Sequence, residues 1–189
     1  MKPLSITFCI AVAFLAAAAF GDSDDQKKAF AKLKTLDGTW QGTMKTTPPS
    51  PGADGTKTTV TMRVASMGNI LMHEMKGEGR PDNPITMFYL DDARLVLTHY
   101  CDAGNRPRMS AKTSPDGKTI EFDFIDVAGG TKYGYMRRAV FTLIDADHHI
   151  EEWTYMMPGE KPIVARVEFK RVGDAAQASA GAEVHQHGM

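Results

Sequence analysis

Short runs of alternating apolar and polar residues fill the chain between residues 37 and 172. The last run is the clearest, because Ile163, Ala165, Val167 and Phe169 alternate with mostly polar neighbours. Successive side chains of a β-strand point to opposite faces, so this alternation predicts strands with one dry and one wet face. Clusters of Gly, Pro, Asp and Asn separate the runs and predict turns. In this way we predict ten strands, at residues 39–47, 58–66, 70–76, 85–90, 95–101, 108–113, 118–125, 136–144, 149–157 and 163–172.

The predicted fold class is all-β, with a single antiparallel closed β-barrel of about ten strands over residues 37–172. No second long helix is available to cover so many one-sided strands, and closing the sheet buries the apolar face and removes its edges. A β-sandwich is the alternative. Residues 48–55 contain three prolines and two glycines and predict an exposed loop.

A short helix is predicted before the barrel, over residues 22–36. Phe30, Leu33 and Leu36 recur there at helical spacing, with aspartates at the start and lysines near the end. We expect its apolar stripe to pack across one mouth of the barrel, and the alternative is an exposed arm.

The two ends of the chain differ from this central part. Residues 1–21 combine Lys2, an apolar run and small residues, which is typical of a secretory signal peptide. The run is shorter than the roughly 20 residues of a membrane-spanning helix, so we expect export to the periplasm or the medium and no integral membrane anchor. Residues 173–189 hold almost no large apolar side chain and are predicted to form a disordered tail.

Charge and cysteine content narrow the possible partners. The chain carries 22 basic and 23 acidic residues and a net charge of −1, which argues against nucleic acid or an anionic membrane as the partner. Of the two cysteines, Cys9 leaves with the signal peptide, so Cys101 has no intramolecular disulfide partner. The composition says nothing of the oligomeric state.

Gly38, Thr39 and Trp40 stand where the helix passes into the first strand, and we expect the Trp40 ring to plug one end of the barrel near Phe169. This Gly-x-Trp motif resembles the first strand of the lipocalin-like (calycin) superfamily. That resemblance implies a basic residue at the end of the last strand, beside the tryptophan, and Arg171 is at this position. We therefore expect Trp40 and Arg171 to close the barrel, with the guanidinium over the ring.

A second stretch, residues 98–109, resembles one found in uncharacterised secreted bacterial lipocalin-like domains. Together the resemblance covers residues 36–172 and implies a cup for small apolar molecules. Lipocalins proper have eight strands and often disulfides. Ten strands without a disulfide are closer to fatty-acid-binding proteins or to nitrobindin-like haem barrels, although the two-helix lid of the former is absent.

The polar residues of the strands do not form a recognisable catalytic or metal motif. His99 and Cys101 share a strand face but lie about 6.6 Å apart, which is too far for a catalytic hydrogen bond. His148 and His149 point to opposite faces and cannot easily share a metal, and the same alternation separates Glu151 from its neighbour Glu152. We predict no catalytic residue, no metal site and no cofactor.

Methionines are frequent, and their flexible side chains suit an adaptable apolar pocket or an irregular core equally well. Our first hypothesis is an exported barrel that binds a small, mostly hydrophobic molecule. The alternatives are a structural or protein-interaction barrel with a filled core, haem binding, and an acid-base enzyme that pairs His99 with a cross-strand carboxylate. The expected ligand-binding residues are Trp40, Met62, His99, Tyr100, Cys101 and Trp153.

Overall fold

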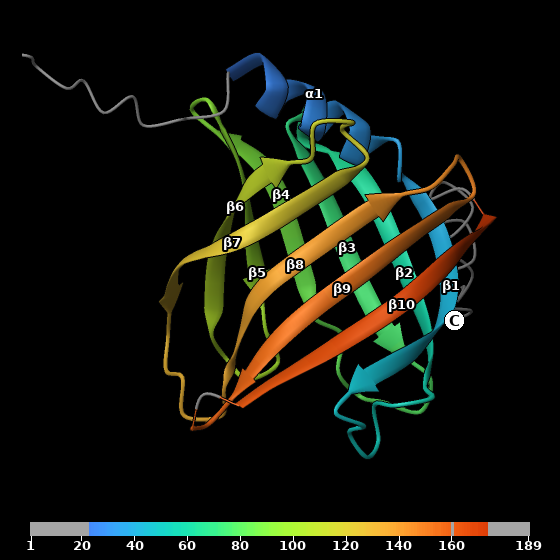
Figure 1. Ribbon diagram of the computed structural model, residues 1–189, viewed down its shortest axis with the longest axis vertical. Helices are drawn as coiled ribbons and strands as arrows, with labels where there is room; N and C mark the ends of the chain where they lie inside the picture. The colour runs from blue at the N-terminus through green and yellow to red at the C-terminus, as the bar shows by residue number, and fades with distance from the viewer. Residues whose placement is uncertain (1–22, 160, 174–189) are drawn as a thin grey trace, which may run out of the picture.

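A computed structural model of the chain describes residues 23–159 and 161–173, which form a closed antiparallel β-barrel of ten strands preceded by one helix (Figure 1). Each strand pairs with the next along the chain, and β1 pairs with β10 to close the sheet. The predicted fold class is confirmed, and the sandwich alternative is excluded. The strands are β1 (Gly38–Thr47), β2 (Lys57–Ala65), β3 (Ile70–Gly77), β4 (Ile85–Asp91), β5 (Arg94–Tyr100), β6 (Arg106–Thr113), β7 (Thr119–Ala128), β8 (Tyr135–Leu143), β9 (His148–Met157) and β10 (Lys161–Gly173).

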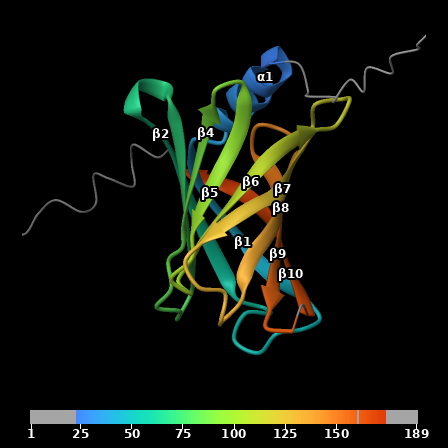
Figure 2. The ribbon, with the colours of Figure 1, turned by 90° about the vertical axis from the view of Figure 1, so that its left-hand side faces the viewer.

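The helix α1 (Ser23–Lys34) lies across one end of the barrel, on the ends of β4, β5 and β6 (Figures 1 and 2). Its buried residues include Phe30 and Leu33, from the predicted apolar stripe. Gln26 fixes the helix to the sheet, because its Oε1 accepts a hydrogen bond of 3.1 Å from the Leu95 amide. No helix in the described part of the chain is long and apolar enough to cross a membrane.

The observed strands differ from the predicted ones mainly at their ends. β6 begins at Arg106 instead of residue 108, and β10 extends from Lys161 to Gly173. The predicted signal peptide (residues 1–21) and almost all of the predicted tail (residues 173–189) lie outside the described residues.

The half of the barrel beneath α1 is a filled apolar core. Phe88, Phe122 and Phe141 are fully buried there and pack edge to face, with ring centroids 5.3–6.1 Å apart. Such T-shaped contacts between aromatic rings are favourable beyond the area that they bury. This half of the barrel is therefore occupied by closely packed side chains.

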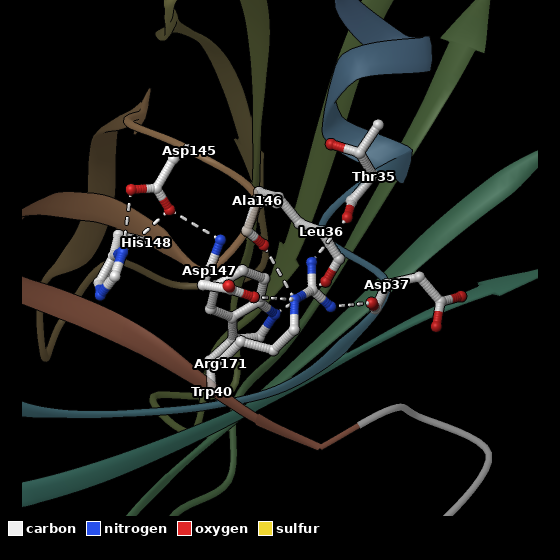
Figure 3. A network of polar contacts seen from close by, with 9 residues as sticks. All are labelled: Thr35, Leu36, Asp37, Trp40, Asp145, Ala146, Asp147, His148 and Arg171. Atoms are coloured by element: carbon white, nitrogen blue, oxygen red, sulfur yellow. Dashed lines mark hydrogen bonds and ion pairs between the residues drawn. The ribbon is translucent and has the colours of Figure 1, made fainter.

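Trp40 and Arg171 lie at the same end of the barrel (Figure 3). Trp40 is fully buried, and its Nε1 donates a hydrogen bond of 2.8 Å to the Leu36 carbonyl. The Arg171 guanidinium lies 4.1 Å from the centre of the indole ring. It also donates hydrogen bonds to the main-chain carbonyls of Asp37 (2.6 Å), Thr35 (2.9 Å) and Ala146 (3.0 Å). One side chain of the last strand thus ties together the helix–strand linker and the β8–β9 turn.

The ring that contacts Trp40 from inside the barrel is His149, at 4.3 Å between centroids. His149 in turn stacks on Phe169 at 5.2 Å. The expected proximity of Trp40 to Phe169 is therefore mediated by an imidazole, which was not predicted at this position. This histidine brings a polar group into the centre of the filled half.

Candidate functional site

A cavity of about 360 Å³ occupies the other half of the barrel, at the end opposite α1. Its walls are mainly apolar. Two imidazoles and one indole line its inner end. The rim is formed by the loops that join β1 to β2, β3 to β4 and β5 to β6. The apolar wall includes Met44, Met75, Met136, Ile163 and Ala165, and the polar and aromatic side chains include His73, His99, Cys101 and Trp153.

The period of two explains how these side chains reach the interior. Leu71, His73 and Met75 occupy alternate positions of β3 and face inward together, with Leu71 in the core and the other two on the cavity wall. The same alternation brings Leu97 and His99 of β5 inside. Position along the strand then decides whether an inward side chain joins the core or the cavity.

Glu151 of β9 is a fully buried carboxylate between the core and the cavity. It accepts three hydrogen bonds: from His149 Nε2 to Oε1 (3.0 Å), from His73 Nε2 to Oε2 (3.0 Å) and from Trp153 Nε1 to Oε2 (2.8 Å). Two of these donors, His73 and Trp153, also line the cavity. The carboxylate therefore fixes the orientation of two of the rings on the cavity wall.

The electrostatics of Glu151 follow from these contacts. Burial by itself raises the pKa of the carboxyl group, but His73 and His149 oppose this effect and hold the pKa well below its usual value. Glu151 is therefore a buried anion. No lysine or arginine pairs with it among residues 23–159 and 161–173, so the two imidazoles are its only partners of potentially opposite charge.

His99 of β5 has a different environment. Its Nδ1 lies 2.8 Å from the hydroxyl of Thr86, its cross-strand partner on β4. Burial, and secondarily the proximity of His73, lowers the pKa of His99 to about 3. His99 is consequently a neutral imidazole at ordinary pH. The carboxylate partner required by the acid-base hypothesis is not found at this residue, because the cross-strand position carries a hydroxyl.

Trp153 joins the two histidines at the inner end of the cavity. Its ring centroid lies 5.6 Å from that of His73 and 5.5 Å from that of His99. The three rings form one aromatic surface. Hydrogen bonds to Glu151 and Thr86 hold its two imidazoles in place. We call His73, His99 and Trp153 the inner triad.

The rim of the cavity is ordered by hydrogen bonds between its loops. Arg80 donates to the Gly52 carbonyl (2.6 Å) and forms a two-pronged pair with Asp82 (2.8 and 2.9 Å). Asp54 Oδ1 accepts a bond of 2.7 Å from the Thr46 amide, which holds the proline-rich loop against β1. The charge of Arg80 is thus already paired with that of Asp82.

Of the predicted ligand-binding residues, His99, Cys101 and Trp153 line the cavity. Trp40 and Met62 are fully buried in the core and do not line it. Tyr100 is 47% exposed on the outside of the barrel. The reason is the strand period, because a residue between inward-facing His99 and Cys101 must point outward.

His73 and Glu151 belong to the site but were not among the predicted residues. A signal for both existed in the sequence. His73 alternates with Leu71 and Met75, and Glu151 alternates with His149 and Trp153, so each is a polar side chain on an otherwise inward-facing series. A polar residue at such a position needs a partner inside the barrel.

Neither metal chemistry nor thiol chemistry finds support in the geometry. The described residues hold no cluster of three or more His, Cys, Asp or Glu side chains suited to a metal ion. Burial raises the pKa of the Cys101 thiol, which disfavours the reactive thiolate. The arrangement is suited to binding an apolar molecule and hydrogen-bonding to it.

A second hollow, of about 810 Å³, lies between α1 and the β6–β7 turn. Most of its charged side chains already have partners. Lys28 pairs with Asp25 at 3.2 Å, and Lys32 donates to the Gly117 carbonyl at 2.8 Å. Because most of its charged side chains are already paired, we do not regard this hollow as the candidate site.

Comparison with known proteins gives information on the fold alone. No protein-family model and no curated protein matches the sequence. Among solved structures, the barrel is similar to a protein of unknown function from the DUF3598 family of Nostoc punctiforme, with a TM-score of 0.51 at 13% sequence identity. The match covers 74% of this chain and 49% of that protein, so the chain spans about half the length of its structural neighbour.

Proposed function

We propose that this protein is an exported lipocalin-like barrel that binds one small, mostly hydrophobic molecule in the cavity opposite α1. The single observation that carries the proposal is the division of the barrel into a filled half and a hollow half. A structural or interaction barrel needs no cavity, and its lining would be expected to collapse into a continuous core. Here a volume of about 360 Å³ is retained.

The size and lining of the cavity support this function. Its volume falls at the lower end of the range of 300 to 1,000 Å³ that is usual for small-molecule sites. Methionines from four different strands, Met44, Met75, Met136 and Met157, form much of the wall. Their flexible and polarisable side chains adapt to ligands of irregular shape.

A pair of neighbouring residues on β10 allows a matched test. Ala165 lines the cavity, whereas Val164 precedes it and is not part of the cavity wall. We expect Ala165→Phe to fill the cavity and Val164→Phe to leave it open, since adjacent strand residues point to opposite faces. Binding of a naphthalene-based fluorescent dye, measured by titration, is the assay.

The proposal predicts that wild type and Val164→Phe bind the dye with similar Kd, and that Ala165→Phe weakens binding at least about tenfold. Thermal unfolding of all three proteins establishes that each is folded. Equal binding by all three would place the dye outside the cavity and refute the assignment. Native mass spectrometry of the protein from its own host then identifies the natural ligand.

Export is a separate part of the proposal and has its own test. It rests on the signal-peptide pattern of residues 1–21. The mass of the protein recovered from the periplasm or the medium should correspond to a chain that begins near residue 22. Recovery of the full-length chain from the cytoplasm alone would contradict export.

A further inference from the structure

The inner triad of His73, His99 and Trp153 restricts which apolar molecules the cavity accepts. We infer that the ligand is a neutral molecule whose polar group both accepts and donates a hydrogen bond, such as an amide or a hydroxy-carbonyl compound, and that it is not a carboxylate. This inference rests on the proposed binding function and deepens it. Three independent features of the site carry it.

The first feature is the orientation of the proton on His99. Thr86 is fully buried, and among the described residues His99 Nδ1 is the only partner of its hydroxyl. A buried hydroxyl group without an acceptor for its proton is costly, so Thr86 donates to Nδ1. In the neutral ring the proton is then on Nε2. His99 therefore offers an N–H donor to the cavity, and the matching ligand atom is an acceptor.

The second feature is the unpartnered nitrogen of His73. The Glu151 carboxylate can only accept, so His73 Nε2 carries the proton of the bond between them. We take the His73 ring to be uncharged, in which case Nδ1 is an acceptor. This atom is buried and has no hydrogen-bond partner within the described structure, although the side chain lines the cavity. A ligand N–H or O–H group would satisfy it.

The third feature is the charge at the inner end. Glu151 is an anion immediately behind His73, and no lysine or arginine of the described residues pairs with it there. Arg80, which lies at the rim, is already paired with Asp82. A ligand carboxylate at the inner triad would lose its hydration without gaining a lysine or arginine partner among the described residues. A neutral polar group avoids this cost.

Four probes with one naphthalene body separate these three features. 2-Ethylnaphthalene has no polar group, 2-acetylnaphthalene adds an acceptor, 2-naphthamide adds an acceptor and a donor, and 2-naphthoate carries a charge. We expect 2-acetylnaphthalene to bind the wild type about fivefold to tenfold more tightly than 2-ethylnaphthalene, and 2-naphthamide to gain about the same factor again. 2-Naphthoate should bind at least about tenfold more weakly than 2-acetylnaphthalene. The Kd values are measured by calorimetric titration.

Thr86→Val tests which nitrogen of His99 carries the proton, because valine has nearly the same shape as threonine but no hydroxyl group. We expect the preference for 2-acetylnaphthalene over 2-ethylnaphthalene to fall to about twofold, because the hydroxyl that holds the tautomer is gone. Nitrogen-15 NMR of the His99 ring should show the proton on Nε2 in the wild type. If the variant does not fold, the four wild-type affinities and the NMR spectrum still decide the matter.

The outcomes separate the two proposals. Tightest binding of 2-naphthoate, equal binding of all four probes, or a proton on His99 Nδ1 would overturn the inference and leave the binding function standing. Failure of all four probes to bind would overturn the binding function as well. The expected order of the four Kd values supports both.

Discussion

Truncation of Trp40 to alanine is the sharpest test of how the barrel is closed. The indole is fully buried at the end of the barrel beneath α1, with His149 on its inner side and Arg171 over its ring. It is not part of the cavity wall. The change should therefore reduce stability and leave ligand binding by the folded protein largely intact.

The expected magnitude follows from the contacts that are lost. Replacing a buried Trp or Phe by alanine lowers the free energy of unfolding by about 3 to 5 kcal/mol. This range includes the cost of losing the hydrogen bond from Trp40 to the Leu36 carbonyl. A domain of this kind has a total stability of about 5 to 15 kcal/mol. Trp40→Phe, the matched control, keeps a ring and loses only the indole N–H and part of the volume, so we expect about 1 to 2 kcal/mol.

Arg171 provides the second side of a double-mutant cycle. We expect Arg171→Ala to cost about 2 kcal/mol, because the guanidinium contributes a cation–π contact and three hydrogen bonds to partly solvated carbonyls. The coupling energy between Trp40 and Arg171 should be about 1 kcal/mol.

The assay is urea unfolding of the four proteins of the cycle, followed by circular dichroism, with a dye titration on each folded sample. A loss below about 1 kcal/mol for Trp40→Ala would refute the plug interpretation. Unchanged thermal stability with abolished dye binding would place Trp40 in the pocket and reverse the orientation assigned to the barrel. A coupling energy of zero would refute the cation–π contribution of Arg171 but not the burial of Trp40.

Three further predictions concern buried polar groups. Glu151→Gln should lower the free energy of unfolding by about 2 to 4 kcal/mol, because three N–H donors lose a charged acceptor. The low pKa of His99, about 3 in the folded state, means that the unfolded chain binds more protons below pH 6.5, so stability should fall by up to about 1.4 kcal/mol per pH unit as the pH is lowered towards 4. Asn105→Ala should cost about 2 kcal/mol and speed hydrogen exchange in the β7–β8 loop, whose Gly130 and Gly134 carbonyls accept from its buried amide.

Controls and contrary outcomes for these three predictions are specific to each. Glu152→Gln changes the neighbouring, outward-facing carboxylate and should be nearly neutral, so equal effects at the two positions would contradict the buried network. His99→Gln should flatten the dependence of stability on pH between 6.5 and 5, and an unchanged slope would assign the proton uptake to other groups. Unaltered exchange in the β7–β8 loop would show that Asn105 does not anchor it.

The alternation of apolar and polar residues was sufficient to predict the strands, their number and the closed barrel. This works because the strand period of two is a local property: it assigns each side chain to a face whatever lies across the barrel. The short helix followed from spacing and end charges in the same way. The sequence also brought Trp40 and Arg171 together, through the resemblance of the Gly-x-Trp motif.

The period of two does not give depth along the barrel axis. Met62 and Met75 are both inward methionines on neighbouring strands, yet one is in the core and the other lines the cavity. Whether an inward-facing methionine joins the core or lines the cavity depends on strand register. It also depends on the side-chain volumes contributed by strands far apart in the sequence. Similarly, Tyr100 was grouped with its neighbours His99 and Cys101, although the period sends it to the outer surface.

Sequence alone thus determined the fold class and the inner and outer faces, whereas the tertiary structure decided where the barrel is hollow and which polar groups meet. His73 and Glu151 are 78 residues apart and share a hydrogen bond of 3.0 Å only because the closed sheet brings β3 and β9 across from each other. Local patterns carry no information on contacts across a barrel interior. The site arises from those contacts, since a buried carboxylate is stable only where donors from other strands converge on it.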